Sequence, residues 1–137
     1  MTNFSETLMD HCQSPRNRGV MESADCVGTT GIPGQGRFIQ LYMKLAAGRV
    51  ERMQFECYGC GVTVAVCSIL TEMTEGLMKS ACESITPTEI AEALDGIPHH
   101  KLDCAHFAVT ALKQALQQWP AEISSPNDSQ TVLIGQS

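Results

Sequence analysis

Alternation of hydrophobic and polar residues in the middle of the chain predicts two neighbouring β-strands. Residues 39–45 place Ile, Leu, Met and Leu at every second position, and residues 53–57 place Met, Phe and Cys in the same way. In a β-strand, side chains at every second position lie on the same face, so the apolar residues of each strand should face a core. Tyr42 and the other intervening side chains are expected to face solvent. Ala47 and Gly48 supply a turn between the segments, and the pattern therefore predicts an antiparallel hairpin.

Helical spacing or helix-capping residues mark four other segments, which are predicted to be α-helices. These segments are residues 4–13, 62–75, 87–96 and 104–119. The first is expected to begin with a capping box formed by Asn3 and Glu6, and the third with one formed by Thr86 and Glu89. The second is apolar on most of its faces, so we expect it to be the central, buried helix.

The remaining segments are rich in turn-forming residues. Residues 14–36 are expected to be mostly loop, with one short strand at residues 26–30. The chain after Trp119 is polar, and residues 120–137 are expected to form a flexible tail. The predicted fold is therefore α+β. Residues 1–119 form one domain, with an N-terminal helix and further helices packed on one face of a small antiparallel sheet.

Length and charge narrow the range of functions. A chain of 137 residues, 43% of them hydrophobic, is long enough for one domain with a core. It shows neither a membrane-length apolar run nor a signal-peptide pattern, so we expect a cytoplasmic protein without a membrane partner. Fifteen acidic and nine basic residues give a net charge of −6 without a Lys/Arg cluster, which argues against a nucleic-acid partner.

Cysteines are the main candidates for chemistry, since seven of them in a reducing compartment are typical of thiols or ligands. Cys60 lies between Gly59 and Gly61, where the strand pattern ends and a helix begins. The free N–H groups and the dipole of a helix start favour a thiolate, which binds metal or attacks sulfur. Cys104 follows Asp103, a favourable N-cap, at the start of the last helix. If both helices pack on the same face of the hairpin, the two thiols should meet.

Three other cysteines, Cys12, Cys26 and Cys82, are interpreted as small core residues. None of them has a second cysteine or a histidine at ligand spacing, except that His11 precedes Cys12. We expect His11 to lie on a helix surface.

Cys57 and Cys67 are also expected to be core thiols. Cys57 lies three residues before Cys60, which suits zinc, but strand alternation turns it inward. Cys67 lies seven residues after Cys60, about 10 Å along the helix and too far for a shared metal ion. A thioredoxin-like enzyme is not favoured, because its first cysteine opens the helix. Cys104 and His106 do not face each other on a helix, and no enzymatic activity is expected.

Five stretches of the sequence resemble one known family in the same order. They are S-P-R-N-R-G at 14–19, V-G-T-T-G at 27–31, F-E-C-Y-G-C-G at 55–61, L-T-E-M-T-E-G at 70–76 and D-G-I-P-H-H-K-L-D-C-A at 95–105. The family is that of the iron-sulfur cluster assembly scaffolds, meaning IscU and the N-terminal domain of NifU. The resemblance extends over about residues 4–119.

This resemblance implies a small antiparallel sheet with helices packed on it, and a role in building clusters rather than catalysing a reaction. Family members receive sulfur from a cysteine desulfurase and iron from an iron donor. They assemble a [2Fe-2S] cluster on three cysteines and a further ligand, and pass it to acceptor apoproteins. Cys60 matches the second family cysteine, and Cys104 matches the third.

The sequence departs from the family pattern around these cysteines. Gln35 stands in place of the first cysteine, and Arg37 in place of an aspartate. Asp103 stands where the scaffolds commonly have histidine, while His106 lies about one turn further along the helix. The loop that binds a chaperone in the IscU branch, Leu-Pro-Pro-Val-Lys, is replaced by residues 97–101, Ile-Pro-His-His-Lys.

Several interpretations stay open at the level of sequence. A [2Fe-2S] cluster needs four ligands. Cys60 and Cys104 could hold it across a homodimer, or the site could be completed by Asp103, His106 or Cys57. A zinc site at the same residues is an alternative, since carboxylate and imidazole both suit zinc. A further alternative is a degenerate scaffold that carries no cluster and regulates a cysteine desulfurase.

Overall fold

The computed structural model describes residues 4–120 of the chain. Its strands are β1 (Cys26–Gly31), β2 (Phe38–Ala46) and β3 (Arg49–Tyr58). Its helices are α1 (Glu6–Gln13), α2 (Gly61–Thr74), α3 (Lys79–Glu83), α4 (Pro87–Ala93) and α5 (Asp103–Leu116), with a 3-10 turn η1 (His99–Lys101) before α5. The expected tail at 120–137 lies outside the described residues, apart from Pro120.

The strands form an antiparallel sheet in the order β1-β2-β3, which confirms the predicted hairpin and the short preceding strand. The hairpin turn uses Ala47 (φ 55°) and Gly48 (φ 76°). Two successive residues with positive φ match the right-handed twist of the strands they join. The hairpin thus brings Phe55 of β3 opposite Leu41 of β2, with both side chains fully buried.

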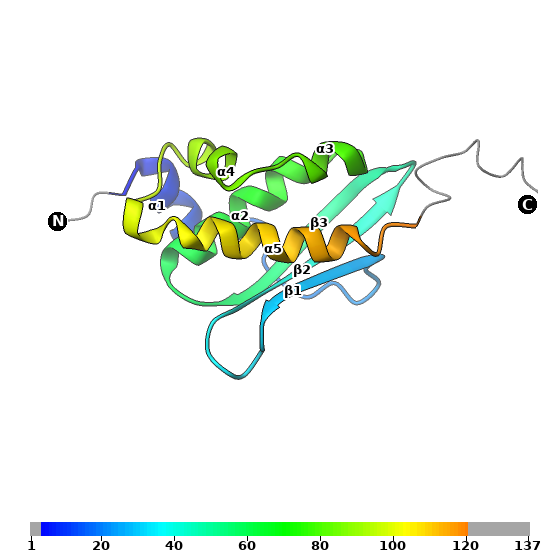
Figure 1. Ribbon diagram of the computed structural model, residues 1–137, viewed down its shortest axis with the longest axis horizontal. Coiled ribbons are helices and arrows are strands. Elements are labelled where there is room, and N and C mark those ends of the chain that lie inside the picture. Colours follow the sequence, from blue (N-terminus) through cyan, green and yellow to red (C-terminus); the bar gives the residue numbers. More distant parts are fainter. Residues whose placement is uncertain (1–3, 121–137) are drawn as a thin grey trace, which may run out of the picture.

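All the helices lie on one side of the sheet, as the α+β prediction required (Figure 1). Helix α5 packs against β1 and β2, and α2 packs against β3. Helix α4 contacts both α2 and α5, α1 packs on α2, and α3 packs on α5. Gly28 of β1 allows the closest approach in this layer, because a Cβ atom there would lie 2.0 Å from the Ala111 carbonyl oxygen of α5. The sheet and the last helix therefore meet backbone to backbone.

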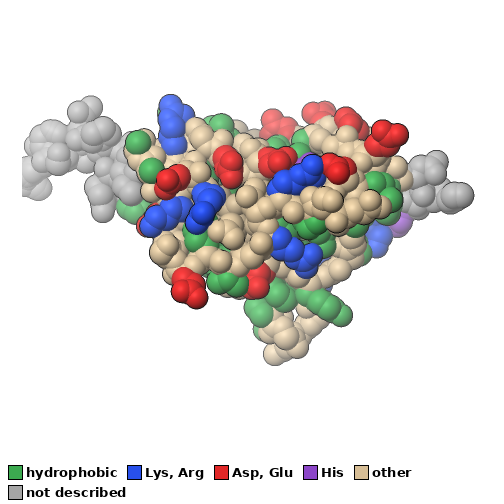
Figure 2. All heavy atoms as spheres, turned by 180° about the vertical axis from the view of Figure 1, so that it is seen from behind, with side chains coloured by type: hydrophobic (Ala, Val, Ile, Leu, Met, Phe, Trp, Pro, Cys, Tyr) green, Lys and Arg blue, Asp and Glu red, His purple; other side chains and the backbone are tan. Residues whose placement is uncertain are grey.

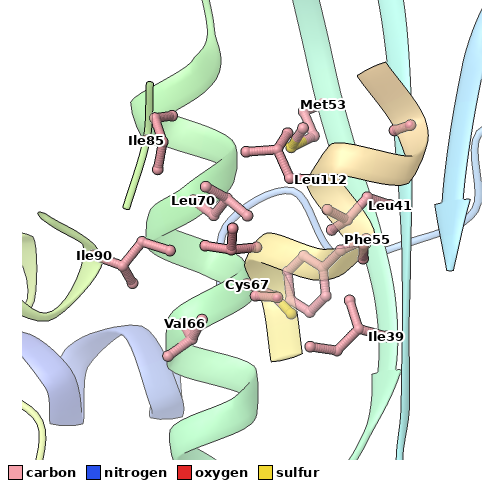
Figure 3. Close-up of a cluster of buried hydrophobic side chains, with 14 of the residues drawn as sticks. Ile39, Leu41, Met53, Phe55, Val66, Cys67, Leu70, Ile85, Ile90 and Leu112 are labelled. Carbon is pink, nitrogen blue, oxygen red and sulfur yellow. The ribbon is translucent and has the colours of Figure 1, made fainter. Parts of the chain in front are cut away.

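Helix α2 is central to the core, as its apolar faces predicted. Its Leu70 and Cys67 are fully buried between the sheet and the outer helices, with Phe55 on the sheet side and Ile90 of α4 on the other side (Figure 3). Burying a large apolar side chain stabilises a fold by about 1.5–3 kcal/mol. Helices α2 and α5 are therefore held firmly on the sheet, and their N-termini have fixed positions.

Helix boundaries differ from the predictions at several points. Helices α4 and α5 end at Ala93 and Leu116, each three residues before the predicted ends at 96 and 119. Ser5, rather than Asn3, caps α1, and its hydroxyl accepts a hydrogen bond from the Leu8 N–H at 2.9 Å. Helix α3 was not predicted, because five residues are too few to show a periodic pattern. Asp103 was predicted to cap α5, but it is the first helical residue, since η1 leads into α5 through Leu102 in a helical conformation. The capping box of α4 is confirmed.

Two side chains expected on the surface are buried. Tyr42 faces outward but is only 7% exposed, because β2 is the middle strand and the neighbouring residues Gln40 and Glu56 cover it. His11 is only 5% exposed, because α1 packs on α2 and turns this side chain into the contact. The predicted surface position of His11 was therefore wrong.

Buried His11 takes part in a polar cluster between α1 and α2. Its Nδ1 lies 2.7 Å from the Ser68 Oγ, which also accepts the Arg16 backbone N–H at 2.8 Å. The other ring nitrogen, Nε2, faces the Glu72 carboxylate at 3.7 Å. Burial lowers the pKa of His11, helped by Arg16 and opposed by Glu72 and Asp10. The imidazole is accordingly neutral at pH 7.

This cluster predicts a pH-dependent stability. Because His11 has a lower pKa in the folded protein than its ordinary value of 6.5, the unfolded chain binds the proton more readily. The stabilising contribution is complete above pH 6.5 and is lost as the pH falls below it. In urea unfolding, His11→Gln should cost about 1 kcal/mol at pH 7.5 and reduce the decline between pH 7 and 5.5. His106→Gln, at an exposed position, is the matched control and should keep the wild-type profile. An unchanged decline in His11→Gln would contradict the assignment.

Candidate functional site

Cys60 lies at the junction of β3 and α2, where it is the N-cap of the helix and is exposed. Its backbone is extended (φ −78°, ψ 174°), so the helix begins directly after it. The flanking glycines are required by close contacts. A Cβ atom at Gly61 would lie 2.6 Å from the Cys12 Sγ, and one at Gly59 would lie 2.9 Å from the Thr63 Oγ1. The backbone on both sides of the exposed thiol is therefore closely packed.

Cys104 lies in the first turn of α5, and its sulfur is 4.0 Å from that of Cys60. The two helices bring their N-termini together because both pack on the same face of the sheet, as the sequence led us to expect. The two thiols differ in their environment, since Cys60 is exposed and Cys104 is 1% exposed. Solvent therefore reaches the pair from the Cys60 side.

Thr63 connects the two thiols, a role that sequence reasoning missed. Its hydroxyl donates a hydrogen bond to the Cys104 Sγ at 3.5 Å, and its Oγ1 lies 3.7 Å from the Cys60 Sγ. Its position three residues after the N-cap was an available signal, because residues three apart on a helix lie on one face.

The environment of the pair separates the pKa values of its members. Burial raises the pKa of Cys60, but the backbone N–H groups of Thr63 and Val62, the Thr63 hydroxyl and the Cys104 thiol outweigh burial and lower the pKa to about 7. Burial raises the pKa of Cys104, and the nearby Cys60 sulfur raises it further. The hydrogen bond from Thr63 acts in the opposite direction and lowers it. At pH 7 the site therefore holds one partly ionised thiol beside a neutral one.

The other residues proposed as ligands do not join this pair. Within residues 4–120 no group of three or more His, Cys, Asp and Glu side chains is placed to hold one metal ion. His106 is exposed on α5, and Cys57 is only 8% exposed at the end of β3. The Asp103 carboxylate accepts a hydrogen bond from the Arg37 guanidinium at 3.0 Å, which lowers its pKa.

Arg37 and Asp103, two of the positions at which the chain departs from the family pattern, therefore contact each other. The Arg37 guanidinium also lies over the Phe107 ring of α5, 4.0 Å from its centre. These contacts join the end of the β1–β2 loop to the start of α5. The loop, which carries Gln35, projects from the body of the protein (Figure 1).

The remaining cysteines lie in or beside the core, as expected. Interaction with the neighbouring Cys67 thiol lowers the pKa of Cys57 against the effect of burial. Burial raises the pKa of Cys67 well above its ordinary value, and that of Cys82 to about 11. These thiols are therefore poor nucleophiles or closed to solvent.

On the face shown in Figure 2, basic and acidic side chains are interspersed and do not form one basic patch. No helix within residues 4–120 has both the length and the apolar character needed to cross a bilayer.

Removing the Thr63 hydroxyl should make Cys60 less reactive at neutral pH. Thr63→Val keeps the shape of the side chain but removes the hydroxyl, which is one of the groups that lower the pKa of Cys60, so this pKa should rise. Alkylation of Cys60 by iodoacetamide, followed by peptide mass spectrometry, should slow about three- to tenfold at pH 7, with a smaller difference at high pH where both proteins are ionised. Thr110→Val makes the same change on the exposed face of α5 and should react like wild type. Equal rates for Thr63→Val and wild type at pH 7 would contradict this role.

Comparison with known proteins agrees with the geometry. The family described as the NifU-like N-terminal domain matches residues 3–125. The iron-sulfur cluster assembly scaffold protein IscU 1 of Archaeoglobus fulgidus is 39% identical over 113 residues, which cover 82% of this chain and 74% of that protein. The corresponding IscU of Escherichia coli strain K12 is 32% identical over 123 residues, which cover 87% of this chain and 95% of that protein.

Solved structures share the fold. A protein described as an iron-sulfur cluster assembly scaffold for the SUF system, from Fervidobacterium islandicum, superposes with a TM-score of 0.65 at 20% identity and covers 82% of this chain and 96% of its own. A NifU-like N-terminal domain from Brucella abortus superposes with a TM-score of 0.51 at 14% identity, covering 88% and 85%. The resemblance noted in the sequence is confirmed, and the chain belongs to the family of the NifU-like N-terminal domain, with IscU scaffold proteins among its relatives.

Proposed function

We propose that this protein is a scaffold for iron-sulfur cluster assembly, which binds iron and sulfide at Cys60 and Cys104 and passes the cluster to acceptor apoproteins. The observation that carries the proposal is the pair of sulfurs 4.0 Å apart at two helix N-termini. Two thiolates on one tetrahedral metal with bonds of about 2.3 Å are separated by about 3.8 Å. The observed separation therefore suits two ligands of a single iron atom with little movement.

The same electrostatics suit a scaffold that loads and releases its cargo. Helix N-termini stabilise negative charge, which a cluster with thiolate ligands carries. The Thr63 hydroxyl can hydrogen-bond to a metal-bound sulfur, since it already donates to Cys104. Cys60 is exposed, so iron, sulfide and an acceptor protein can reach the site directly. Zinc would bind the same pair of thiolates and compete with iron.

The chain supplies two thiolates of the four ligands that a [2Fe-2S] cluster needs. Asp103 is engaged by Arg37, and His106 and Cys57 lie apart from the pair. We therefore assign the remaining ligands to Cys60 and Cys104 of a second copy, which makes the loaded form a homodimer with the cluster between its subunits. In this role the protein receives sulfur from a cysteine desulfurase and iron from an iron donor in the cytoplasm, and acts as a scaffold rather than an enzyme.

Anaerobic reconstitution with ferrous iron and sulfide tests the function. Wild type should develop the visible absorption of a [2Fe-2S] cluster, contain about one iron per chain and elute as a dimer. Cys60→Ser and Cys104→Ser should each lose most of the absorption, because each removes two of the four shared ligands. Cys82→Ala, at a buried site on α3, is the control and should load like wild type. A colourless, iron-free wild type with both thiols reduced would refute the proposal.

Restoring the family residues in the β1–β2 loop should strengthen the site. Gln35→Cys combined with Arg37→Asp adds a thiol and releases Asp103 from its ion pair. The cluster should then persist at least severalfold longer in the presence of a chelator, and more of it should be held by single chains, as measured by absorption and gel filtration. If only this double variant forms a cluster, the natural chain lacks the proposed activity.

A further inference from the structure

We propose that Cys60 and Cys104 form a reversible disulfide by exchange with small disulfides, and that this disulfide closes the site to metal. The consequence for metal rests on the function proposed above, whereas formation of the disulfide does not. The geometry points to an attacking and a resolving thiol, which is a reaction of the pair rather than of either cysteine alone.

The distance between the sulfurs is short enough for bond formation. They are 4.0 Å apart, and a disulfide bond is about 2.05 Å long, so a movement of about 2 Å is required. Cys60 is the N-cap of α2, so its φ and ψ are not helical, although its carbonyl oxygen accepts a hydrogen bond from the Val64 N–H at 3.2 Å. Rotation of the Cys60 side chain can therefore bring its sulfur toward that of Cys104 while α2 and α5 stay on the sheet.

The two thiols differ in access, which sets the order of the steps. Cys60 is exposed, so a dissolved disulfide meets this sulfur first. Cys104 is 1% exposed and lies beneath it, where only a group already attached to Cys60 is within reach. Cys57 and Cys67 are buried in the core. Cys12 lies against Gly61 and is partly exposed, so it is the alternative partner for Cys60 that peptide mapping distinguishes.

The exchange balances with glutathione disulfide as the oxidant. The Cys60 thiolate attacks one sulfur of the reagent, the S–S bond of the reagent breaks, and one glutathione thiolate leaves. The Cys104 sulfur then attacks the Cys60 sulfur, the mixed disulfide breaks, and a second glutathione leaves with the proton of Cys104. One disulfide is reduced to two thiols, and the protein loses two hydrogen atoms.

Formation of this disulfide would remove both proposed ligands at once. Thiolates bind metal, whereas a disulfide sulfur is a poor ligand with no charge. Because the chain brings no third cysteine, histidine or carboxylate to the pair within residues 4–120, no partial site would remain. The oxidised form would be unable to accept iron until a thiol reduces it.

To test the inference, metal-free, reduced protein is treated with glutathione disulfide. The products are identified by intact mass and peptide mapping. Wild type should lose the mass of two hydrogen atoms, keep no glutathione and yield the linked Cys60 and Cys104 peptides. Cys104→Ser should retain one glutathione on Cys60, and Cys60→Ser should stay largely unreacted. Cys82→Ala is the matched control and should behave like wild type. Circular dichroism confirms that each variant is folded.

Two results would overturn the inference. One is a stable glutathione adduct on Cys60 of wild type, and the other is a disulfide that links a different pair. A second measurement compares iron loading of the oxidised and reduced proteins, with dithiothreitol to reverse the oxidation. Loss of loading in the oxidised form is expected, and equal loading would refute the closure of the site. If the reduced protein also fails to bind iron, the proposed function fails while the disulfide assignment stands.

Discussion

The packing of α2 and α5 side by side on one face of the sheet is the constraint on which the rest of this structure depends. Each helix buries an apolar stripe against the strands, and the backbone contact at Gly28 sets the distance of α5 from β1. Since both helices begin at the same end of the sheet, their N-termini meet there (Figure 1). The core thus determines where the chemistry takes place, although Cys60 contributes little to the core itself.

Two helix starts facing one point create a local field that favours negative charge. The two cysteines in this field differ in their pKa values. Cys60, at the edge, is stabilised as a thiolate by N–H groups and by Thr63, while Cys104, one layer deeper, is kept neutral by burial. Both proposals rest on the geometry of this pair, in which an exposed sulfur lies 4.0 Å from a buried one.

The Arg37–Asp103 ion pair connects the β1–β2 loop with the start of α5. An aspartate and a histidine, the residues that the family resemblance leads one to expect there, would both be available to a metal. Arginine and aspartate instead satisfy each other, and the stacking of Arg37 on Phe107 adds a further contact. The loop is joined to α5 by charge and stacking, and the two thiols are the ligands that we propose for iron.

The sequence determined much of this. Alternation and helical spacing are local properties, so they predicted the hairpin, the central helix and the positions of Cys60 and Cys104 at helix starts. Motifs in a fixed order identified the family. Three features depended on residues far apart in the chain. The burial of His11 by Ser68, the Thr63 hydroxyl between two thiols, and the pairing of Arg37 with Asp103 could not be predicted from local patterns. Only the packing of α1 and α5 against their neighbours decided them, because contacts between distant segments leave no periodic signal in either segment.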